Sequence, residues 1–398
     1  MRMCKGFYTL LIAQFLSALA DNALLFAAIA LLAQMQSPDW HTPLLQQFFV
    51  ISYIVLAPFV GSFADALPKG RVMFIANAIK FIGSLAMILG FPPLYAYGIV
   101  GIGAAAYSPA KYGILTELLP PEKLVGANGW MEGSTVIAII MGAIVGGILA
   151  GNDPKLAIMI ITVLYLLAAI FNIYIPKLPI DHKLPKKNPA FMLTDFWYSF
   201  KALWLDARGQ VSLAVTTLFW GAGATLRLVV IAWAASALNF SLEQSTQLMA
   251  LLAVGIAVGS VIAARYIKLE ESTKVLPAGI IMGLLVIIMA FVQHWQLAVV
   301  LLFIIGALAG FFVVPLNALL QHRGHELIGA GHSIAVQNFN EHIGILLMLG
   351  AYLLMVKAQI SISLIVIAFG LFVSICMTII HRHYRFIKPC DDSVKSDY

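Results

Sequence analysis

Long runs of apolar residues recur along the whole chain, and they constrain its fold more than any other feature. A run of about 20 apolar residues in helical conformation crosses the hydrocarbon core of a bilayer. Because backbone polar groups find no water inside lipid, such runs must form helices. Twelve runs can be delimited, at 7–34, 44–66, 70–91, 93–118, 126–150, 154–176, 209–237, 244–267, 274–293, 295–321, 329–355 and 359–381. The sequence therefore predicts an all-α polytopic membrane protein with about twelve transmembrane helices.

The composition agrees with this prediction. Hydrophobic residues make up 61% of the chain and charged residues 11%, whereas soluble proteins carry about 25% charged residues. The start resembles a signal peptide, but its apolar run continues through Ala33, which is too long for one. We expect an uncleaved first helix. The three cysteines are odd in number and form no CxxC pair, so neither a disulfide nor a zinc site is predicted.

The distribution of lysine and arginine predicts the orientation. With the N-terminus in the cytoplasm, only Lys155 and Lys357 fall in outward loops, and Lys80, Lys111 and Arg227 fall inside spans. All other cations then lie on the cytoplasmic side, which is the positive-inside bias of membrane proteins. Both termini are therefore expected in the cytoplasm. The net charge of +6 is explained by topology and anionic lipid headgroups, and no nucleic-acid partner is needed.

A polar break at 177–208 divides the chain into a six-helix bundle at 1–176 and a second at 209–381, followed by a cytoplasmic tail at 382–398. The break carries Lys177, Lys183, Lys186 and Lys187. Within it, Phe196, Phe200, Leu203 and Trp204 recur at helical spacing, with Trp197 beside them and Lys201 opposite. This pattern predicts a short helix, either lying on the membrane surface or packed as an ordinary linker.

The two halves are weakly similar in sequence. Residues 15–21 match 219–225, residues 109–111 match 315–317, and residues 124–127 match 327–330, in the same order. Such internal repeats are typical of transporters, whose substrate site lies between the repeats. The glycine pairs Gly142/Gly146 and Gly255/Gly259 have the spacing that permits close helix packing.

Charged residues inside a bilayer are costly and are often functional. Asp21 lies midway along its predicted span, and Arg227 lies at a nearly equivalent height in the other half. We expect the two to face each other across a central cavity. Their opposite charges suit a zwitterionic headgroup or a salt bridge that substrate opens; the alternative is a structural ion pair.

Further polar residues complete the candidate site. Lys111 is either a phosphate contact inside the cavity or a cation that reaches the cytoplasmic interface. Glu132 and Glu341 either carry a coupling cation or proton or hold helices together. Asn22, Asn317, Gln337 and Asn338 are assigned to the substrate site, although amides are also common in helix packing. His322, His325 and His332 cluster near one turn without the spacing of metal ligands.

Several function classes lack their motifs. The chain has no GxxxxGK[ST] phosphate loop, no histidine followed five residues later by aspartate, and no GxSxG sequence. No polar loop is long enough to hold a catalytic domain. We therefore expect a transporter without its own ATP-driven motor, and not an enzyme.

Twelve spans in two halves with a basic central loop resemble the major facilitator superfamily. The segment from Gly61 to Asp65, followed by Lys69, Gly70 and Arg71, resembles the signature of that superfamily between its second and third helices. Ala66 stands where a basic residue is expected, and the spacing to Arg71 is stretched. The resemblance implies that Asp65 and Arg71 latch the cytoplasmic side shut.

More specific strings are similar to the bacterial lysophospholipid transporters. They cover residues 13–26, 105–115, 219–223 and 310–321. The resemblance implies a monomer that imports lysophospholipids, chiefly lysophosphatidylethanolamine, from the outer to the inner leaflet of the inner membrane. It also implies a separate acyltransferase/acyl-carrier-protein synthetase that reacylates them.

Within such a site, Lys111 and Arg227 would hold the lipid phosphate and Asp21 the amine. No cofactor is expected, and coupling to sodium or protons stays open. The same fold also supports a cation-coupled exporter of drugs or small amphipathic solutes, which is the alternative function.

Overall fold

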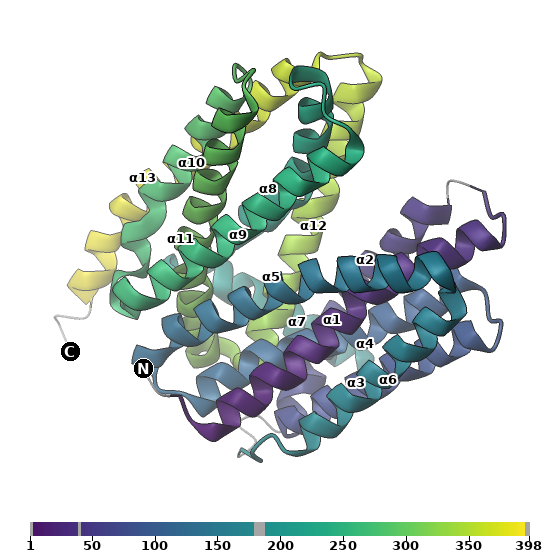
Figure 1. Ribbon diagram of the computed structural model, residues 1–398. Coiled ribbons are helices and arrows are strands. Elements are labelled where there is room, and N and C mark those ends of the chain that lie inside the picture. The colour runs from purple at the N-terminus through teal and green to yellow at the C-terminus, as the bar shows by residue number, and fades with distance from the viewer. Residues whose placement is uncertain (1–2, 39–40, 179–187, 395–398) are drawn as a thin grey trace. The chain divides into compact units, whose positions relative to one another are not determined.

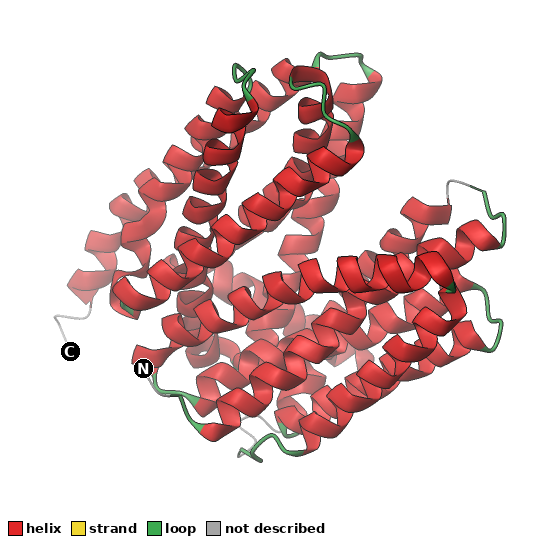
Figure 2. Ribbon diagram, viewed as in Figure 1, coloured by secondary structure: helices red, strands yellow, loops and turns green. Residues whose placement is uncertain are grey.

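The computed structural model describes residues 3–38, 41–178 and 188–394. Within these residues the chain is almost entirely helical and contains no strand (Figures 1 and 2). The helices are α1 Lys5–Gln34, α2 His41–Ala66, α3 Lys69–Ile88, α4 Pro93–Leu118, α5 Pro121–Asn152, α6 Pro154–Ile173, α7 Pro189–Leu205, α8 Ala207–Ala237, α9 Leu242–Tyr266, η1 Leu269–Val275, α10 Leu276–Met289, α11 Trp295–Ile328, α12 Ala330–Lys357 and α13 Ile362–Val394.

The predicted fold class is confirmed. Eleven helices of the described chain are long and apolar enough to cross a membrane. The twelfth expected span is α4, which has the expected length but contains many small and polar residues. Every residue from Gly103 to Ala110 is buried, and α4 packs against α1, α2 and α3. A helix shielded from lipid on most sides does not need a strongly apolar surface.

The helices differ from the predicted spans mainly at their ends. Helix α13 continues to Val394, whereas the apolar run ends at 381. Hydropathy marks where the lipid-facing part of a helix ends, and a helix can continue beyond it into water. Helix α7 occupies the polar break of the sequence. The break also includes 179–187, with Lys183, Lys186 and Lys187, which lie outside the described residues.

The apolar stripe of α7 packs against α12. The rings of Phe196 and Phe200 lie 5.4 and 6.2 Å from that of Phe339, both edge to face. Phe196 is buried, whereas Trp197 and Tyr198 are exposed. These contacts favour the packed linker helix, and its placement on a membrane surface stays a prediction.

The chain forms two compact units. Unit 1 comprises Met1–Pro120, Ser134–Lys201 and Gly324–Phe339; unit 2 comprises Pro121–Gly133, Ala202–Arg323 and Asn340–Tyr398. Helices α5, α7, α11 and α12 therefore each contribute one segment to each unit. The division of the chain into bundles at 1–176 and 209–381 stays a prediction.

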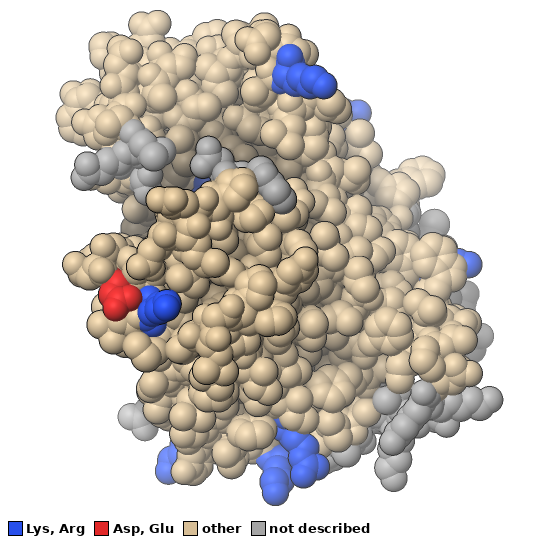
Figure 3. Space-filling view, turned by 90° about the vertical axis from the view of Figure 1, so that its right-hand side faces the viewer, with Lys and Arg blue, Asp and Glu red and all other residues tan. Residues whose placement is uncertain are grey.

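Glycine pairs bring helices into close contact within both units. In unit 1, a Cβ on Gly142 or Gly146 of α5 would lie 2.7 or 2.6 Å from atoms of Asn22 and Ala23 on α1. In unit 2, Gly255 and Gly259 of α9 lie directly against the backbone of α11. Small residues permit this approach, as the sequence pattern predicts. On the face drawn in Figure 3, charged side chains are few and most of the surface is uncharged, as suits a lipid environment.

Candidate functional site

Unit 1 holds a partly buried ion pair between two of its helices. Asp21 of α1 meets Lys80 of α3, with 2.7 Å between Asp21 Oδ2 and Lys80 Nζ. The hydroxyl of Tyr165, on α6, donates a hydrogen bond to Asp21 Oδ1 over 2.8 Å. Because α6 packs against both α1 and α3, the three polar side chains are brought together by the bundle itself.

The two members of this ion pair differ in their access to solvent. The side chain of Lys80 is 1% exposed and that of Asp21 is 22% exposed. Lys80 also donates a hydrogen bond to Ser17 Oγ at 3.0 Å, and its ammonium lies 4.8 Å from the centre of the Tyr107 ring. A buried ammonium needs such partners. The carboxylate of Asp21 is thus the accessible member, with Lys80 behind it.

Lys80 is the functional candidate that sequence reasoning missed. It was recognised as one of three cations inside spans but received no role, although an aspartate in an apolar helix requires a counter-charge. Arg227 lies on α8 in unit 2, where its side chain is exposed. The pairing of Arg227 with Asp21 across the two units stays a prediction.

Other predicted site residues of unit 1 lie on α1, α4 and α12. Asn338 donates a hydrogen bond to Ser108 Oγ at 2.9 Å. Lys111, one turn further along α4, is partly buried, and its ammonium lies 4.1 Å from the centre of the Tyr112 ring. Asn22 donates to the carbonyl of Ala18 in its own helix. Gln337, next to Asn338, is buried.

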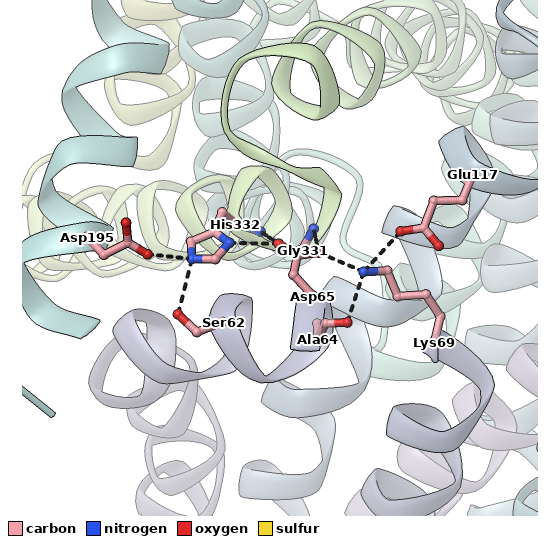
Figure 4. Close-up of polar contacts among 8 residues, drawn as sticks. All are labelled: Ser62, Ala64, Asp65, Lys69, Glu117, Asp195, Gly331 and His332. Atoms are coloured by element: carbon pink, nitrogen blue, oxygen red, sulfur yellow. Dashed lines mark hydrogen bonds and ion pairs between the residues drawn. The ribbon is translucent and has the colours of Figure 1, made fainter. Parts of the chain in front are cut away.

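A second charged cluster lies where α2 ends and α3 begins. Lys69 Nζ lies 2.6 Å from Asp65 Oδ1 and 3.1 Å from Glu117 Oε1 on α4. The side chains of all three residues are less than a tenth exposed. Lys69 also donates to the carbonyl of Ala64. Figure 4 shows Lys69 between the two carboxylates.

The carboxylate of Asp65 is paired with Lys69, whereas the side chain of Arg71 is exposed. The assignment of Asp65 and Arg71 to a latch stays a prediction. Asp65 lies in the last turn of α2 and Lys69 is the first residue of α3, so the short break at Leu67 and Pro68 brings the two side chains together. Lys69 is thus the cation that pairs with Asp65 in this signature, a role that sequence reasoning did not assign to it.

Asp65 also binds the first turn of α12. The backbone amides of Gly331 and His332 donate to its two carboxylate oxygens over 2.7 and 3.0 Å. The first amides of a helix have no partner within the helix and attract negative charge. Asp65 supplies that charge, so the end of α2 is bound to the start of α12 within unit 1.

The imidazole of His332 extends this cluster to α7. Its Nδ1 lies 2.7 Å from Asp65 Oδ2, and its Nε2 lies 2.9 Å from Asp195 Oδ2 and 3.1 Å from Ser62 Oγ. The ring thus lies between two carboxylates (Figure 4). Sequence reasoning grouped His332 with two other histidines near one turn but did not connect it to Asp65 or Asp195.

In unit 2, polar contacts join α5 to α11. The side-chain amides of Asn128 and Gln321 donate to each other at 2.8 Å in both directions. One turn further along α5, Glu132 lies 3.5 Å from the amide of Asn317. Glu132 is buried, and so is Glu341 on α12. Roles of Glu132 and Glu341 in coupling stay predictions.

A partly exposed ion pair between Arg323 and Asp206 lies at the start of α8. Arg323 of α11 donates to Asp206 Oδ1 from Nε at 3.0 Å and from Nη2 at 2.7 Å. Asp206 also caps α8 by accepting from the Gly209 amide. Partial burial raises the pKa of Asp206, but the hydrogen bonds from Arg323 and Gly209 outweigh it, so this pKa lies below its usual value.

The family model of the "Major Facilitator Superfamily" matches residues 10–349. The chain belongs to the major facilitator superfamily. It is therefore a multi-pass membrane transporter. Among solved structures, the fucose:proton symporter FucP "in the outward conformation" matches with a TM-score of 0.75 and 14% identity, covering 96% of this chain and 98% of that one. A bacterial homologue of the iron transporter ferroportin matches with a TM-score of 0.76 and 15% identity, covering 96% and 100%.

Relatives within the major facilitator superfamily are much closer in sequence. A protein of Yersinia enterocolitica named "Lysophospholipid transporter LplT" is 47% identical over 361 residues, 90% of this chain and 89% of that protein. The protein of the same name from Serratia proteamaculans is 49% identical over 356 residues, 89% of each. The resemblance to the bacterial lysophospholipid transporters is thus confirmed.

Proposed function

We propose that this chain transports lysophospholipids, chiefly lysophosphatidylethanolamine, from the outer to the inner leaflet of the bacterial inner membrane. The observation that carries the proposal is the 47–49% identity over about nine-tenths of the chain to proteins named as lysophospholipid transporters. The structures at 14–15% identity support the fold alone, and they do not favour a drug exporter.

The polar groups of unit 1 suit part of such a substrate. A lysophospholipid carries one acyl chain and a phosphate, and the ethanolamine lipid adds an ammonium. Asp21 offers a partly exposed carboxylate, whose oxygens accept from Lys80 and Tyr165 and retain further lone pairs. We assign the ammonium to this carboxylate and the phosphate to Lys111 and Arg227.

Lys80 weakens the attraction of Asp21 for the ammonium. A substrate ammonium about 3 Å from the carboxylate, opposite Lys80, would lie about 6 Å from the lysine nitrogen. At an effective dielectric constant of about 20, the attraction is about 5 kcal/mol and the repulsion about 3 kcal/mol. The net attraction is therefore about 2 kcal/mol, roughly thirty-fold in affinity, from which the cost of desolvating the ammonium is subtracted.

The second charged cluster is proposed as the cytoplasmic latch of the transport cycle. Asp65 binds the first turn of α12, and α12 continues from unit 1 into unit 2. Breaking these contacts would release α12 from α2, which is a step that alternating access requires. In this proposal Lys69 and His332 hold the carboxylate in place.

The setting follows from the same proposal. The chain works as a monomer with both termini in the cytoplasm, and a separate acyltransferase/acyl-carrier-protein synthetase consumes the lipid it delivers. Because reacylation removes the product, movement can proceed downhill without an ion. Coupling to sodium or protons through Asp21, Glu132 or Glu341 is the alternative.

Uptake of labelled lysophosphatidylethanolamine tests the proposal. Spheroplasts that lack their own importer express this chain, its Arg227→Gln variant, or its Lys155→Gln variant. The last is the control, because it also removes one positive charge but lies outside the proposed substrate site. We expect uptake and reacylated product with the wild type and the control, and a strong loss with Arg227→Gln. If the well-expressed wild type gives neither uptake nor product, the lipid assignment is wrong.

A further inference from the structure

A crevice at one end of unit 1 is lined by none of the charged residues in the polar clusters described above. It is formed where α3 begins and α6 ends, and it has a volume of about 330 Å³. Gly70 determines how closely these ends approach, since a Cβ there would lie 3.0 Å from both the Asn172 carbonyl oxygen and Ile175 Cβ. The walls are mostly apolar, and Phe74 and Ile173 on them are 38% and 62% exposed. Such side chains suit contact with lipid.

Two cations border this apolar crevice. Arg71 comes from α3, and Lys177 follows the end of α6; both are exposed. Within the described residues, neither forms an ion pair with a carboxylate. Two cations without a carboxylate partner in the described part of the chain, beside an apolar surface, are complementary to a ligand with one anionic end and one apolar end.

A buried side-chain amide beside the crevice also lacks hydrogen-bond partners among the described residues. Asn172 lines the crevice and is 1% exposed. Its side-chain nitrogen and oxygen are buried without a hydrogen-bond partner among the described residues. Such unpaired groups are rare in folded proteins, and a rotated Asn172 amide would offer a donor to a ligand phosphate.

We propose that this crevice binds the phosphate headgroup of an anionic phospholipid from the surrounding membrane. The volume lies at the low end of ligand pockets, so it accommodates the headgroup region while the acyl chains lie outside along α3 and α6. Guanidinium and ammonium groups are both common phosphate ligands. The crevice lies at the end of the bundle where lysine and arginine bias predicts the cytoplasm, so the lipid belongs to the cytoplasmic leaflet.

This site is independent of the substrate site. Its groups lie at the start of α3 and the end of α6, whereas the Asp21–Lys80 pair lies midway along its helices. The inference therefore stands or falls separately from the proposed transport of lysophospholipids.

Native mass spectrometry of the purified full chain tests the proposal. The probes are phosphatidylglycerol, the neutral-headgroup lipid phosphatidylcholine, and glycerol phosphate as the soluble headgroup. The variants are Arg71→Gln/Lys177→Gln and the control Lys155→Gln, which lies at the opposite end of α6. We expect the double variant to lose about thirty-fold in phosphatidylglycerol affinity, about five-fold for each cation, and the control to bind like the wild type.

Three results would overturn the proposal. The double variant and the wild type binding phosphatidylglycerol equally would remove the role of the two cations. Equal binding of phosphatidylglycerol and phosphatidylcholine by the wild type would show a site without selectivity for charge. Displacement of the lipid by an equal concentration of glycerol phosphate would show a phosphate site rather than a lipid site.

Discussion

The ion pair between Asp21 and Lys80 predicts unequal effects for its two partners. Asp21→Asn leaves an ammonium that is 1% exposed, with the Ser17 hydroxyl and aromatic faces as its remaining partners. Lys80→Met leaves a carboxylate that still accepts from Tyr165 and is partly accessible. Removing one partner of a buried pair costs about 3–5 kcal/mol. We expect Asp21→Asn near the upper value and Lys80→Met near the lower one.

The double variant Asp21→Asn/Lys80→Met distinguishes a purely structural role of the ion pair from a role in substrate binding. It removes both charges together, so we expect it to recover most of the free energy of unfolding that either single variant loses. We also expect it to transport little lysophospholipid, because the carboxylate for the ammonium is gone. If it recovers both stability and transport, the pair only braces the helices.

Chemical unfolding of each purified variant in detergent micelles measures the free energies, and uptake into liposomes measures transport. The reasoning is refuted if Asp21→Asn costs less than Lys80→Met, or if the losses of the two single variants simply add in the double variant. Either result would mean that Asp21 does not compensate the charge of Lys80.

Three further predictions follow from other parts of the molecule. In liposome transport, Lys111→Gln and Arg227→Gln should impair ethanolamine and glycerol lysolipids alike, whereas Asp21→Asn should impair the ethanolamine lipid several-fold more; equal losses would remove its amine role. His332→Leu should raise hydrogen exchange across α7, since it loses its contact with that helix; unchanged exchange would show that the contact does not hold α7. Asp206→Asn should cost about 1 kcal/mol at neutral pH. Because the folded-state pKa of Asp206 is lowered, that cost should persist above pH 4 and vanish as the pH falls below this; a cost that does not change with pH would contradict the assignment.

The membrane helices could be predicted because each must satisfy its own backbone in lipid. Hydropathy located them to within a few residues at most ends. It did not predict the continuation of α13 to Val394, because residues beyond 381 are polar while remaining helical. The predicted span 93–118 coincides with α4, although α4 is buried from Gly103 to Ala110.

The candidate site was harder to predict because it depends on how helices rotate against one another. The sequence shows that Asp21 and Lys80 are both charged residues inside spans, but only packing of α1 and α3 against α6 brings their side chains together. The contact between His332 and Asp195 joins residues 137 positions apart, and no local pattern indicates it. Asp65 and Lys69 are close in sequence, but their contact depends on the break between α2 and α3, which the sequence analysis did not resolve.

Transport by the purified chain in liposomes tests the central claim most directly. Fluorescent lysophosphatidylethanolamine is added to the outer leaflet, and the fraction protected from extraction by albumin is followed over time. We predict protein-dependent protection that unlabelled lysophosphatidylethanolamine competes away and that two-chain phosphatidylethanolamine does not show. No protein-dependent protection, or equal protection of the two-chain lipid, would contradict a lysophospholipid transporter.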